Sequence, residues 1–266
     1  MANVKPKKSL GQHFLTDLGI AARIAATVDT CPGLPVVEVG PGMGVLTKFL
    51  VEAGRDLTVV ELDSESVEYL RQGHVPGLPP DRIVEADFLR LDLAALTGGR
   101  QCCIIGNYPY NISSQIFFKV LDNRHLVQEC SGMLQREVAE RICAPEGSKT
   151  RGILSVLLQM WYDAEYLFTV PEHVFNPPPK VKSGVIRLRR NGVTDPGCDF
   201  ALMRTVVKTT FGQRRKTIRN SARSLLPAGI VFPSDSPLGA MRPEQLSVQQ
   251  FVELTNLIDS LRKQAI

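Results

Sequence analysis

The sequence lacks the features that would place the protein at a metal centre, in a membrane or in an oxidising compartment. Its six cysteines include no C-x-x-C pair and its four histidines no H-E-x-x-H pattern, so no metal site is indicated. No apolar run approaches the roughly 20 residues that span a bilayer, and no apolar secretory segment follows the charged start. We therefore expect no metal, no membrane association, reduced cysteines and a cytoplasmic location.

Aromatic residues are scarce, at 6% of 266 residues, and the chain has no internal repeats or low-complexity segments. The rest of the composition, 44% hydrophobic and 22% charged, is that of a globular protein. Its length allows one sizeable core and a smaller domain. No heptad pattern or long apolar patch predicts a dimer, so we expect a monomer.

Acidic residues are missing from one stretch near the C-terminal end. Residues 200–266 carry ten Lys and Arg against four Asp and Glu, whereas the rest of the chain sums to −2. Seven of the ten lie between Arg204 and Arg223, with no acid among them. Such a run is either a solvated helix face or a surface for a polyanion such as RNA.

Strand and helix patterns alternate through about Arg189, which predicts parallel βαβ units. Within this part the strands are expected over residues 34–39, 56–60, 82–84, 102–105 and 185–189. The helices are expected over residues 17–28, 45–53, 113–121 and 127–142. The turn-rich segment 191–197 is the best domain linker.

The residues after the linker are expected to form an all-helical domain. Helices are expected over 200–211 and 214–226, and a third begins at Ser247, where Ser-x-x-Gln has the form of a capping box. The sequence thus predicts an α/β domain over residues 1–190, with residues 1–15 as an N-terminal arm and loop, and a small helical domain over 198–266.

The first strand leads into a loop suited to a nucleotide. Gly40-Pro41-Gly42-Met43-Gly44 lies between the strand 34–39 and a helical pattern. Glycines let the backbone turn sharply and approach a ligand, with helix N–H groups behind them. The spacing is tighter than the G-x-G-x-x-G of dinucleotide folds, which disfavours NAD.

Carboxylates follow the next two strands. Glu61, before Leu62, can accept hydrogen bonds from both hydroxyls of a ribose. Asp87, before Phe88, can accept from the amino group of adenine. Either acid alone is more often a solvated charge or a helix N-cap. It is their position, one after each of two successive strands, that indicates a nucleotide site.

The most informative segment is Gly106-Asn107-Tyr108-Pro109-Tyr110, directly after the apolar run 102–105. It places a carboxamide, an exposed carbonyl and an aromatic ring on one rigid turn, since proline fixes its own φ and offers no donor. The Asn107 oxygen and a carbonyl next to Pro109 can accept both N–H bonds of an exocyclic amino group, while Tyr110 stacks on the base. The alternative is an ordinary strand-to-turn junction.

Four segments together resemble one family, the S-adenosylmethionine-dependent ribosomal RNA adenine N6,N6-dimethyltransferases. They are Ser9–Leu15, Glu38–Gly44, Asn107–Ser113 and Phe175–Val181. Phe211–Asn220 resembles the branch that acts on bacterial small-subunit (16S) rRNA, the KsgA/RsmA type. The resemblance implies a Rossmann-like class I methyltransferase domain and, as substrate, two adjacent adenosines in the hairpin loop near the 3′ end of that rRNA in the 30S particle.

The resemblance also implies roles for residues at matching positions. The residues implied to hold S-adenosylmethionine are Gln12, His13, Leu15, Gly40, Gly42, Glu61, Leu62, Asp87, Phe88 and Asn107. Those implied to hold the target adenine are Asn107, Pro109, Tyr110 and Phe175. Phe175 would stack on the base opposite Tyr110; the alternative is that it fills the core. Two positions depart from the family pattern, which has Asn at His13 and an aliphatic residue at Tyr108.

Phosphate contacts are expected from the basic stretch and from the proline-rich loop. The candidates are Arg214, Arg215, Lys216, Arg219, Arg223 and Lys180, with Arg136 and Arg141 as weaker additions. Three other functions stay open: a large-subunit rRNA methyltransferase of the macrolide-resistance type, an assembly factor in which methylation is incidental, and a DNA adenine methyltransferase. The last is disfavoured because no sequence-reading domain is evident.

Overall fold

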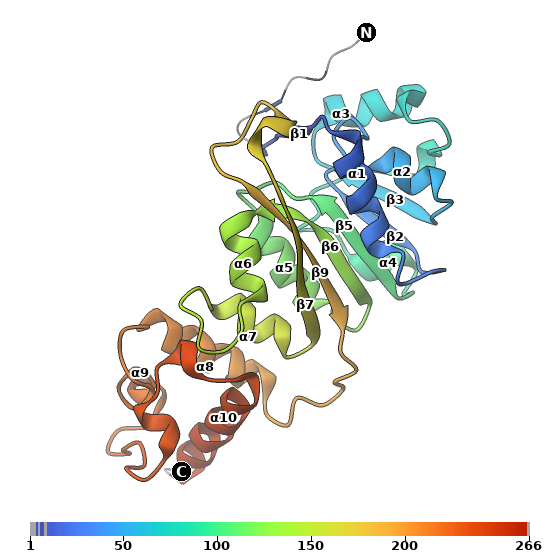
Figure 1. Cartoon of the computed structure of the whole chain (residues 1–266). Coiled ribbons are helices and arrows are strands. Elements are labelled where there is room, and N and C mark those ends of the chain that lie inside the picture. Colours follow the sequence, from blue (N-terminus) through green and yellow to red (C-terminus); the bar gives the residue numbers. More distant parts are fainter. Residues whose placement is uncertain (1–3, 5, 8–9, 265–266) are drawn as a thin grey trace. The chain divides into compact units, whose positions relative to one another are not determined.

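The computed structural model describes residues 4, 6–7 and 10–264, and the chain divides into two compact units (Figure 1). The first unit comprises residues 1–140 and 163–190, and the second comprises residues 141–162 and 191–266. Ser9, the first residue of the N-terminal motif, and several other residues of the arm 1–15 lie outside the described residues.

A seven-stranded sheet forms the first unit, with its strands in the order β4-β3-β2-β5-β6-β9-β7. The strands from β4 to β6 are parallel, whereas β9 runs antiparallel to β6. Their bounds are β2 (Val36–Val39), β3 (Leu57–Glu61), β4 (Ile83–Glu85), β5 (Cys102–Asn107), β6 (Val127–Gln135), β7 (Tyr162–Val170) and β9 (Ser183–Arg190). The expected α/β architecture is confirmed.

Helices cover the sheet and place the main apolar core on one of its faces. Because alternate strand residues point to opposite faces, Val59, Ile105 and Met133 share one buried cluster with Ile24 and Leu50 of the first two helices. The helices are α1 (Leu18–Ala25), α2 (Thr47–Glu52), α3 (Ser64–Tyr69), α4 (Leu93–Thr97), α5 (Ser113–Asp122) and α6 (Arg136–Cys143). Each fully buried side chain of this size contributes about 1.5–3 kcal/mol, which keeps the strand ends on a rigid edge.

The chain changes direction across the sheet between β2 and β5. After β2 it continues to β3 and β4 on one side, and it then returns to β5 on the other side of β2. Loops leaving these two strands therefore diverge, and ligands of open α/β sheets bind in the crevice between them. The loops that begin at Gly40 and Asn107 leave the sheet at this point.

A second, two-stranded sheet fixes the N-terminal segment. Strand β1 (Phe14–Leu15) pairs antiparallel with β8 (Phe175–Asn176), and Leu15 lies opposite Phe175. The backbone N–H and the hydroxyl of Thr16 both donate to the Val174 carbonyl at 2.8 Å. The N-terminal segment is thereby tied to the loop between β7 and β9.

The second unit is helical. Its helices are α7 (Ile153–Gln159), α8 (Phe200–Gly212), α9 (Ile218–Ser221) and α10 (Val248–Lys263). Asp199 caps α8 by accepting from Ala201 N and Leu202 N, and Ser247 and Gln250 form the expected capping box of α10. The ring of Phe211 in α8 stacks on the ring of Phe251 in α10, with centroids 6.0 Å apart. This contact joins the two longest helices of the unit.

Short turns of 3-10 or π type complete both units. They are η2 (Ala26–Val28), η3 (Leu70–His74), η4 (Pro80–Arg82), η5 (Glu172–Val174), η6 (Arg223–Leu225), η7 (Pro237–Ala240) and η8 (Pro243–Gln245). All six cysteines are free. Among the described residues, no helix is long and apolar enough to cross a membrane.

Two of the expected helices are wrong. Residues 127–135 form strand β6, and only residues 136–143 are helical. The strand is buried on both faces of the sheet, and its apolar residues are spaced as on one face of a helix, at Val127, Cys130, Met133 and Leu134. In the expected helix 214–226, only Ile218–Ser221 is α-helical. Arg215, Arg219 and Arg223 are four residues apart, where like charges on one helix face repel each other and destabilise a long helix.

The division into units differs from the expected domain boundary in one segment. Residues 141–162, expected within the domain 1–190, belong to the second unit. The Trp161 ring meets the Phe200 ring edge-on at 5.1 Å, and Gly147 N donates to the Glu244 carbonyl at 2.8 Å. Helix α7 thus buries its apolar side chains with the C-terminal helices.

Candidate functional site

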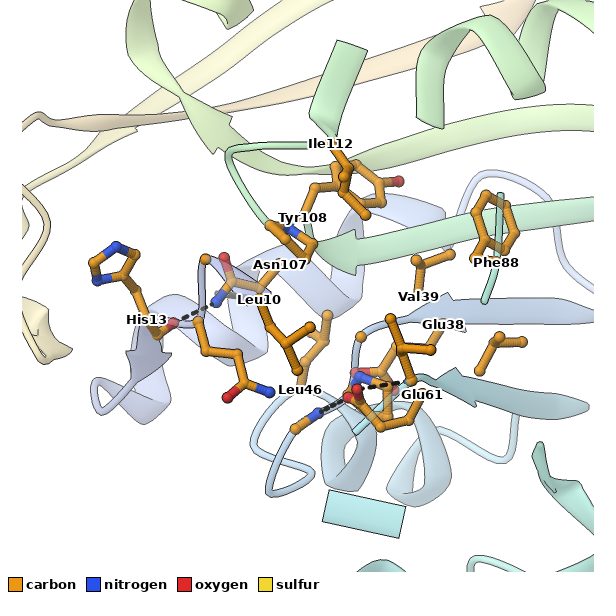
Figure 2. A pocket seen from close by; sticks show the side chains of 18 of the residues that line it. Leu10, His13, Glu38, Val39, Leu46, Glu61, Phe88, Asn107, Tyr108 and Ile112 are labelled. Carbon is orange, nitrogen blue, oxygen red and sulfur yellow. Dashed lines mark hydrogen bonds between the residues drawn. The ribbon is translucent and has the colours of Figure 1, made fainter. Parts of the chain in front are cut away.

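A pocket opens at the carboxyl ends of β2, β3 and β5, where the strand order changes direction (Figure 2). Four stretches of chain supply nearly all of its lining: residues 10–15, 38–46, 86–89 and 107–112. Ten of the predicted cofactor residues line it, namely Gln12, His13, Leu15, Gly40, Gly42, Glu61, Leu62, Asp87, Phe88 and Asn107. Pro109 and Tyr110 line it as well.

The glycine loop needs residues without a side chain. Gly40, Gly42 and Gly44 have φ values of 70°, 54° and 77°, which side-chain-bearing residues rarely adopt. A Cβ on Gly42 would lie 2.8 Å from a ring carbon of Phe14, and one on Gly44 would lie 2.3 Å from a methyl of Val75. Gly42 thus lines the pocket beside Phe14, whereas Gly44, outside the pocket lining, leaves room for Val75 of the core.

Glu61 holds the glycine loop and its own strand end together. Its carboxylate accepts from Gly42 N at 3.0 Å and from Leu62 N and Asp63 N at 2.9 Å. The residue is 6% exposed, and burial raises the pKa of its carboxyl, while the three backbone N–H groups oppose that shift. The acid at this strand end is a fixed part of the pocket wall.

Glu38 also lines the pocket, although the sequence analysis assigned it no role. It is 1% exposed, and burial, with a further contribution from the charge of Glu61, raises its pKa to about 8. Its Oε2 atom has no hydrogen-bond partner among the described residues. The available signal was an acid inside an otherwise apolar strand, directly before the glycine loop.

Asp87 and Phe88 form the wall beyond β4. Asp87 accepts from Leu89 N at 2.9 Å and lies 3.5 Å from Arg90, while Phe88 is buried. Lys119 of α5 donates to the Leu89 carbonyl at 3.3 Å and lies over the Phe88 ring. Helix α5 thus fixes this wall from behind.

Asn107 is the last residue of β5, and its side chain has a defined orientation. Its Nδ2 donates to the His13 carbonyl at 3.0 Å. Because a carbonyl oxygen can only accept, the amide nitrogen faces His13 and Oδ1 faces away from it. Figure 2 shows this bond on the wall of the pocket, and the arrangement leaves an acceptor where an amino group would bind.

The residues after Asn107 are anchored to neighbouring strands. The buried Tyr108, whose pKa burial raises well above its ordinary value, donates from its hydroxyl to the Ser131 carbonyl at 2.7 Å. Tyr110 is half-buried, and its hydroxyl bonds to that of Ser183 at 2.5 Å. The departure at Tyr108 therefore fills the space above β6 and fastens the loop to it.

The segment 10–15 forms one side of the pocket and is held at its start. Lys7 contacts Asp63 at 2.5 Å and Glu65 at 3.1 Å, and its backbone N–H donates to Gln12. Burial alone would raise the pKa of Asp63, but hydrogen bonds led by that from Lys7 lower it. Gln12 Nε2 lies 3.4 Å from the Asp63 carboxylate, so the segment is attached two residues after Glu61, at the end of β3.

Phe175 is not brought into the pocket. It is 4% exposed and packs in the main apolar cluster, paired with Leu15 across the small sheet. Lys180 lies exposed on the loop before β9. The described residues contain no group of three or more His, Cys, Asp or Glu side chains that could hold a metal ion.

The predicted phosphate contacts of the basic stretch all lie in the second unit. Arg215, Lys216, Arg219 and Arg223 are exposed. Arg214 is half-buried, donates to the Lys149 carbonyl and lies 3.7 Å from Glu244. Arg214 is therefore partly committed to holding its own unit together.

Comparison with known proteins identifies the family. The model of the ribosomal RNA adenine dimethylase family matches residues 3–260. The chain belongs to this family. Two similar proteins are both named ribosomal RNA small subunit methyltransferase A: that of Parabacteroides distasonis is 64% identical and that of Phocaeicola vulgatus 60% identical. The matches cover 100% and 99% of this chain, and 98% and 93% of those proteins.

Solved structures of this kind share the fold. A dimethyladenosine transferase from Plasmodium falciparum superposes with a TM-score of 0.74 at 21% identity, over 96% of this chain and 99% of its own. The 23S rRNA methyltransferase ErmE gives 0.66 at 26% identity, over 92% of this chain and 99% of its own. The expected class I methyltransferase fold is thus confirmed.

Proposed function

We propose that the protein transfers methyl groups from S-adenosylmethionine to N6 of two adjacent adenosines near the 3′ end of small-subunit rRNA, and that it methylates each base twice. The observation that carries this proposal is the side chain of Asn107 in the pocket that Pro109 and Tyr110 also line. Its Nδ2 donates to the His13 carbonyl, so Oδ1 faces away from His13 and can accept from an amino group. The names of the relatives at 60–64% identity favour the small subunit as substrate.

The pocket fits S-adenosylmethionine by the chemistry of its donors. The backbone of the Gly40–Gly44 loop is open to the methionine part, Glu61 offers a carboxylate to the ribose, and Asp87 can accept from the adenine amino group. Phe88 adds an apolar wall beside Asp87. When bound, the cofactor supplies a methyl group on a positively charged sulfur.

Asn107 and a backbone carbonyl beside Pro109 would orient the target nitrogen. The lone pair of an adenine amino group is delocalised into the ring, so this nitrogen is a poor nucleophile until it pyramidalises. Two acceptors, one for each amino hydrogen, favour that geometry and direct the lone pair at the methyl group. The reaction needs no general base in this arrangement, because the amino group loses its proton only after it has become a cation.

We assign stacking on the target base to Tyr110, one of the aromatic residues that line the pocket. Stacking of one base on an aromatic ring is worth about 1–3 kcal/mol, and the base must leave its own stack to reach the pocket. Phe175 packs against Leu15 instead, so we assign it the support of the N-terminal segment. The base grip then depends on Tyr110.

We assign phosphate binding to the exposed basic residues of the second unit. Arg215, Lys216 and Arg223 are exposed and can follow an RNA backbone, whereas the exposed Arg219 also donates to the Ser234 carbonyl at 3.0 Å. Lys180 is an exposed candidate in the first unit. Phosphate contacts position an RNA without selecting a base. On this basis the second unit holds the substrate, and the pocket of the first selects adenine.

The test is transfer of labelled methyl from S-adenosylmethionine to small subunits that lack their own adenine dimethylation, followed by nucleoside analysis. We expect label in N6,N6-dimethyladenosine. Purified large subunits serve as the control acceptor, and label there instead would favour the large-subunit function. We further infer that the enzyme acts as a monomer in the cytoplasm, which sedimentation and cell fractionation would check.

An assembly role can be separated from catalysis. An Asn107→Ala protein keeps the exposed basic residues of the second unit but loses the side-chain acceptor for the target amino group. If it restores small-subunit assembly in a deletion strain, binding carries that role and methylation is incidental to it. If it fails while remaining bound to subunits, methyl transfer itself is required.

A further inference from the structure

We propose that His13 is a positioning residue for the target adenine, acting through Asn107, Tyr110 and Pro177, and that its imidazole does not serve the cofactor. This inference rests on the function proposed above and assigns a new role within the same site. Three separate contacts carry it, and all lie within the first unit.

The first contact fixes the imidazole ring and its tautomer. His13 Nδ1 lies 2.8 Å from the Pro177 carbonyl oxygen. A carbonyl can only accept, so Nδ1 carries the proton. Figure 2 shows the ring pointing away from the other labelled side chains of the pocket, toward the side opposite Glu61 and Phe88. The ring therefore holds the proline-rich loop, whereas the carbonyl of His13 accepts from Asn107 in the pocket lining.

The second contact supports the stacking residue. The rings of His13 and Tyr110 have centroids 5.4 Å apart and an interplanar angle of 31°. At its other end, the Tyr110 hydroxyl bonds to Ser183 on β9. Tyr110 is thus held from both ends, and loss of the His13 ring would free the edge that faces the N-terminal segment.

The third contact sets the acceptor of the amino group. The His13 carbonyl accepts from Asn107 Nδ2, which turns Oδ1 toward the substrate side. The backbone of the N-terminal segment also approaches this loop closely, since a Cβ on Gly11 would lie 2.6 Å from Asn111 Oδ1. Because the His13 ring holds the N-terminal segment in place, the His13 carbonyl fixes the orientation of Asn107. If the segment were loosened, the Asn107 carboxamide could rotate.

The two functions of the ring can be tested separately by substitution. His13→Phe keeps an aromatic ring against Tyr110 and removes the hydrogen bond to Pro177. His13→Asn keeps a donor for that carbonyl and removes the ring, and His13→Ala removes both. The matched control is His74→Ala, because the His74 ring also stacks on a tyrosine, Tyr69, at 4.1 Å, outside the pocket.

The measurement is single-turnover methyl transfer to undermethylated small subunits, together with the dissociation constant of S-adenosylmethionine for each protein. We expect His13→Ala to lower the single-turnover rate about tenfold, as for loss of one buried hydrogen bond and one ring contact. His13→Phe and His13→Asn should each lose about threefold by the same reasoning. Cofactor affinity should stay within about twofold, and His74→Ala should match the wild type.

Two results would overturn the assignment. An unchanged rate in all three variants would show that the contacts do not position the substrate. A loss of cofactor affinity as large as the loss of rate would return His13 to the cofactor. Absence of methyl transfer by the wild type would instead refute the proposed function, so the two failures are distinguishable.

Discussion

The pocket of the first unit and the basic surface of the second hold their charges in opposite ways. In the pocket, Glu38 and Glu61 are 1% and 6% exposed, and Glu61 accepts three backbone hydrogen bonds. On the basic surface, which we define as Arg215, Lys216, Arg219 and Arg223, the side chains are exposed. One region depends on a few groups in fixed positions, and the other on the number of charges.

This contrast predicts how each region responds to substitution. When a substitution removes one partner of a buried hydrogen bond, the partner that stays is left unpaired and carries its full desolvation penalty. Each change in the pocket should therefore have a large and specific effect. Exposed charges that contact phosphates act through counterion release, so their effects should be small, additive and dependent on salt.

The largest effect is expected at Asn107. Asn107→Ala removes the acceptor of the target amino group and should lower the single-turnover rate by about 10²–10³, as for other preorganised polar groups. Binding of small subunits should be unchanged. Asn123→Ala is the matched control, because Asn123 Nδ2 also donates to a backbone carbonyl, that of Lys119, outside the pocket. Equal rates in both variants would remove Asn107 from the mechanism.

The second effect is a pH dependence of stability caused by Glu38. Its pKa is raised to about 8 in the fold and is near 4.5 when unfolded, so between these values the folded state holds a proton that the unfolded state lacks. The contribution to stability is fully present below pH 4.5 and is lost as pH rises toward 8. Glu38→Gln should remove this pH-dependent contribution, which changes the free energy of unfolding by a few kcal/mol between pH 4.5 and 8.

Unfolding by denaturant at pH 5, 6.5 and 8, without cofactor, checks this expectation. The Gln variant should gain stability relative to the wild type as pH rises, by the amount that ionisation of Glu38 costs. Glu85→Gln is a suitable control, because Glu85 lies at the end of β4, two strands away from β2 in the same sheet, with an exposed side chain. If the free energy of unfolding changed with pH in the same way for the wild type and Glu38→Gln, a group other than Glu38 would bind the proton.

Glu61 provides the next comparison, again with Glu85, its register partner on β4. Glu61→Gln replaces one acceptor oxygen by a donor that faces the N–H groups of Gly42, Leu62 and Asp63. Because bonds to a charged acceptor contribute about 1.5–3 kcal/mol, cofactor affinity should fall at least tenfold. Glu85→Gln should leave it unchanged in the same titration calorimetry. A similar loss in both variants would mean that Glu61 acts through general stability.

Much of the pocket could be predicted from the sequence, because its residues follow strands. Strand ends in a parallel sheet meet at one edge, so Gly40, Glu61, Asp87 and Asn107 could be placed together without knowing the packing. Glu38 was not predicted as a pocket residue: an acid inside an apolar strand stands out in the sequence, but no spacing pattern connects it to a site. The base-stacking role of Phe175 is implied by the family resemblance alone, and its pairing with Leu15 is a long-range contact that local sequence does not encode.

The helical segments were predictable where caps and apolar stripes agreed. Ser247 and Gln250 defined the start of α10 correctly, since both act within one turn. Strand β6 was not predictable, because a strand buried on both faces loses the alternation that distinguishes it from a helix. The assignment of residues 141–162 to the second unit depends on contacts such as Trp161 with Phe200, which are distant in sequence.

The smallest effects per residue are expected on the basic surface, where the number of charges should matter more than their identity. The triple substitution Arg215→Gln, Lys216→Gln, Arg223→Gln removes three exposed charges. Each phosphate contact contributes about 0.7–0.9 to the slope of log affinity against log salt, so the slope for small-subunit binding should fall by about 2. Cofactor affinity should not change.

The control removes charge from the same unit outside this surface, at the exposed Arg242 and Lys263. If Arg242→Gln, Lys263→Gln leaves the slope intact while the triple variant flattens it, the position of the charges matters as well as their number. If both variants reduce the salt dependence of binding equally per charge removed, only the net charge of the unit determines RNA binding. If neither changes the slope, the RNA is bound elsewhere, and the contrast between the two regions would have to be drawn within the first unit alone.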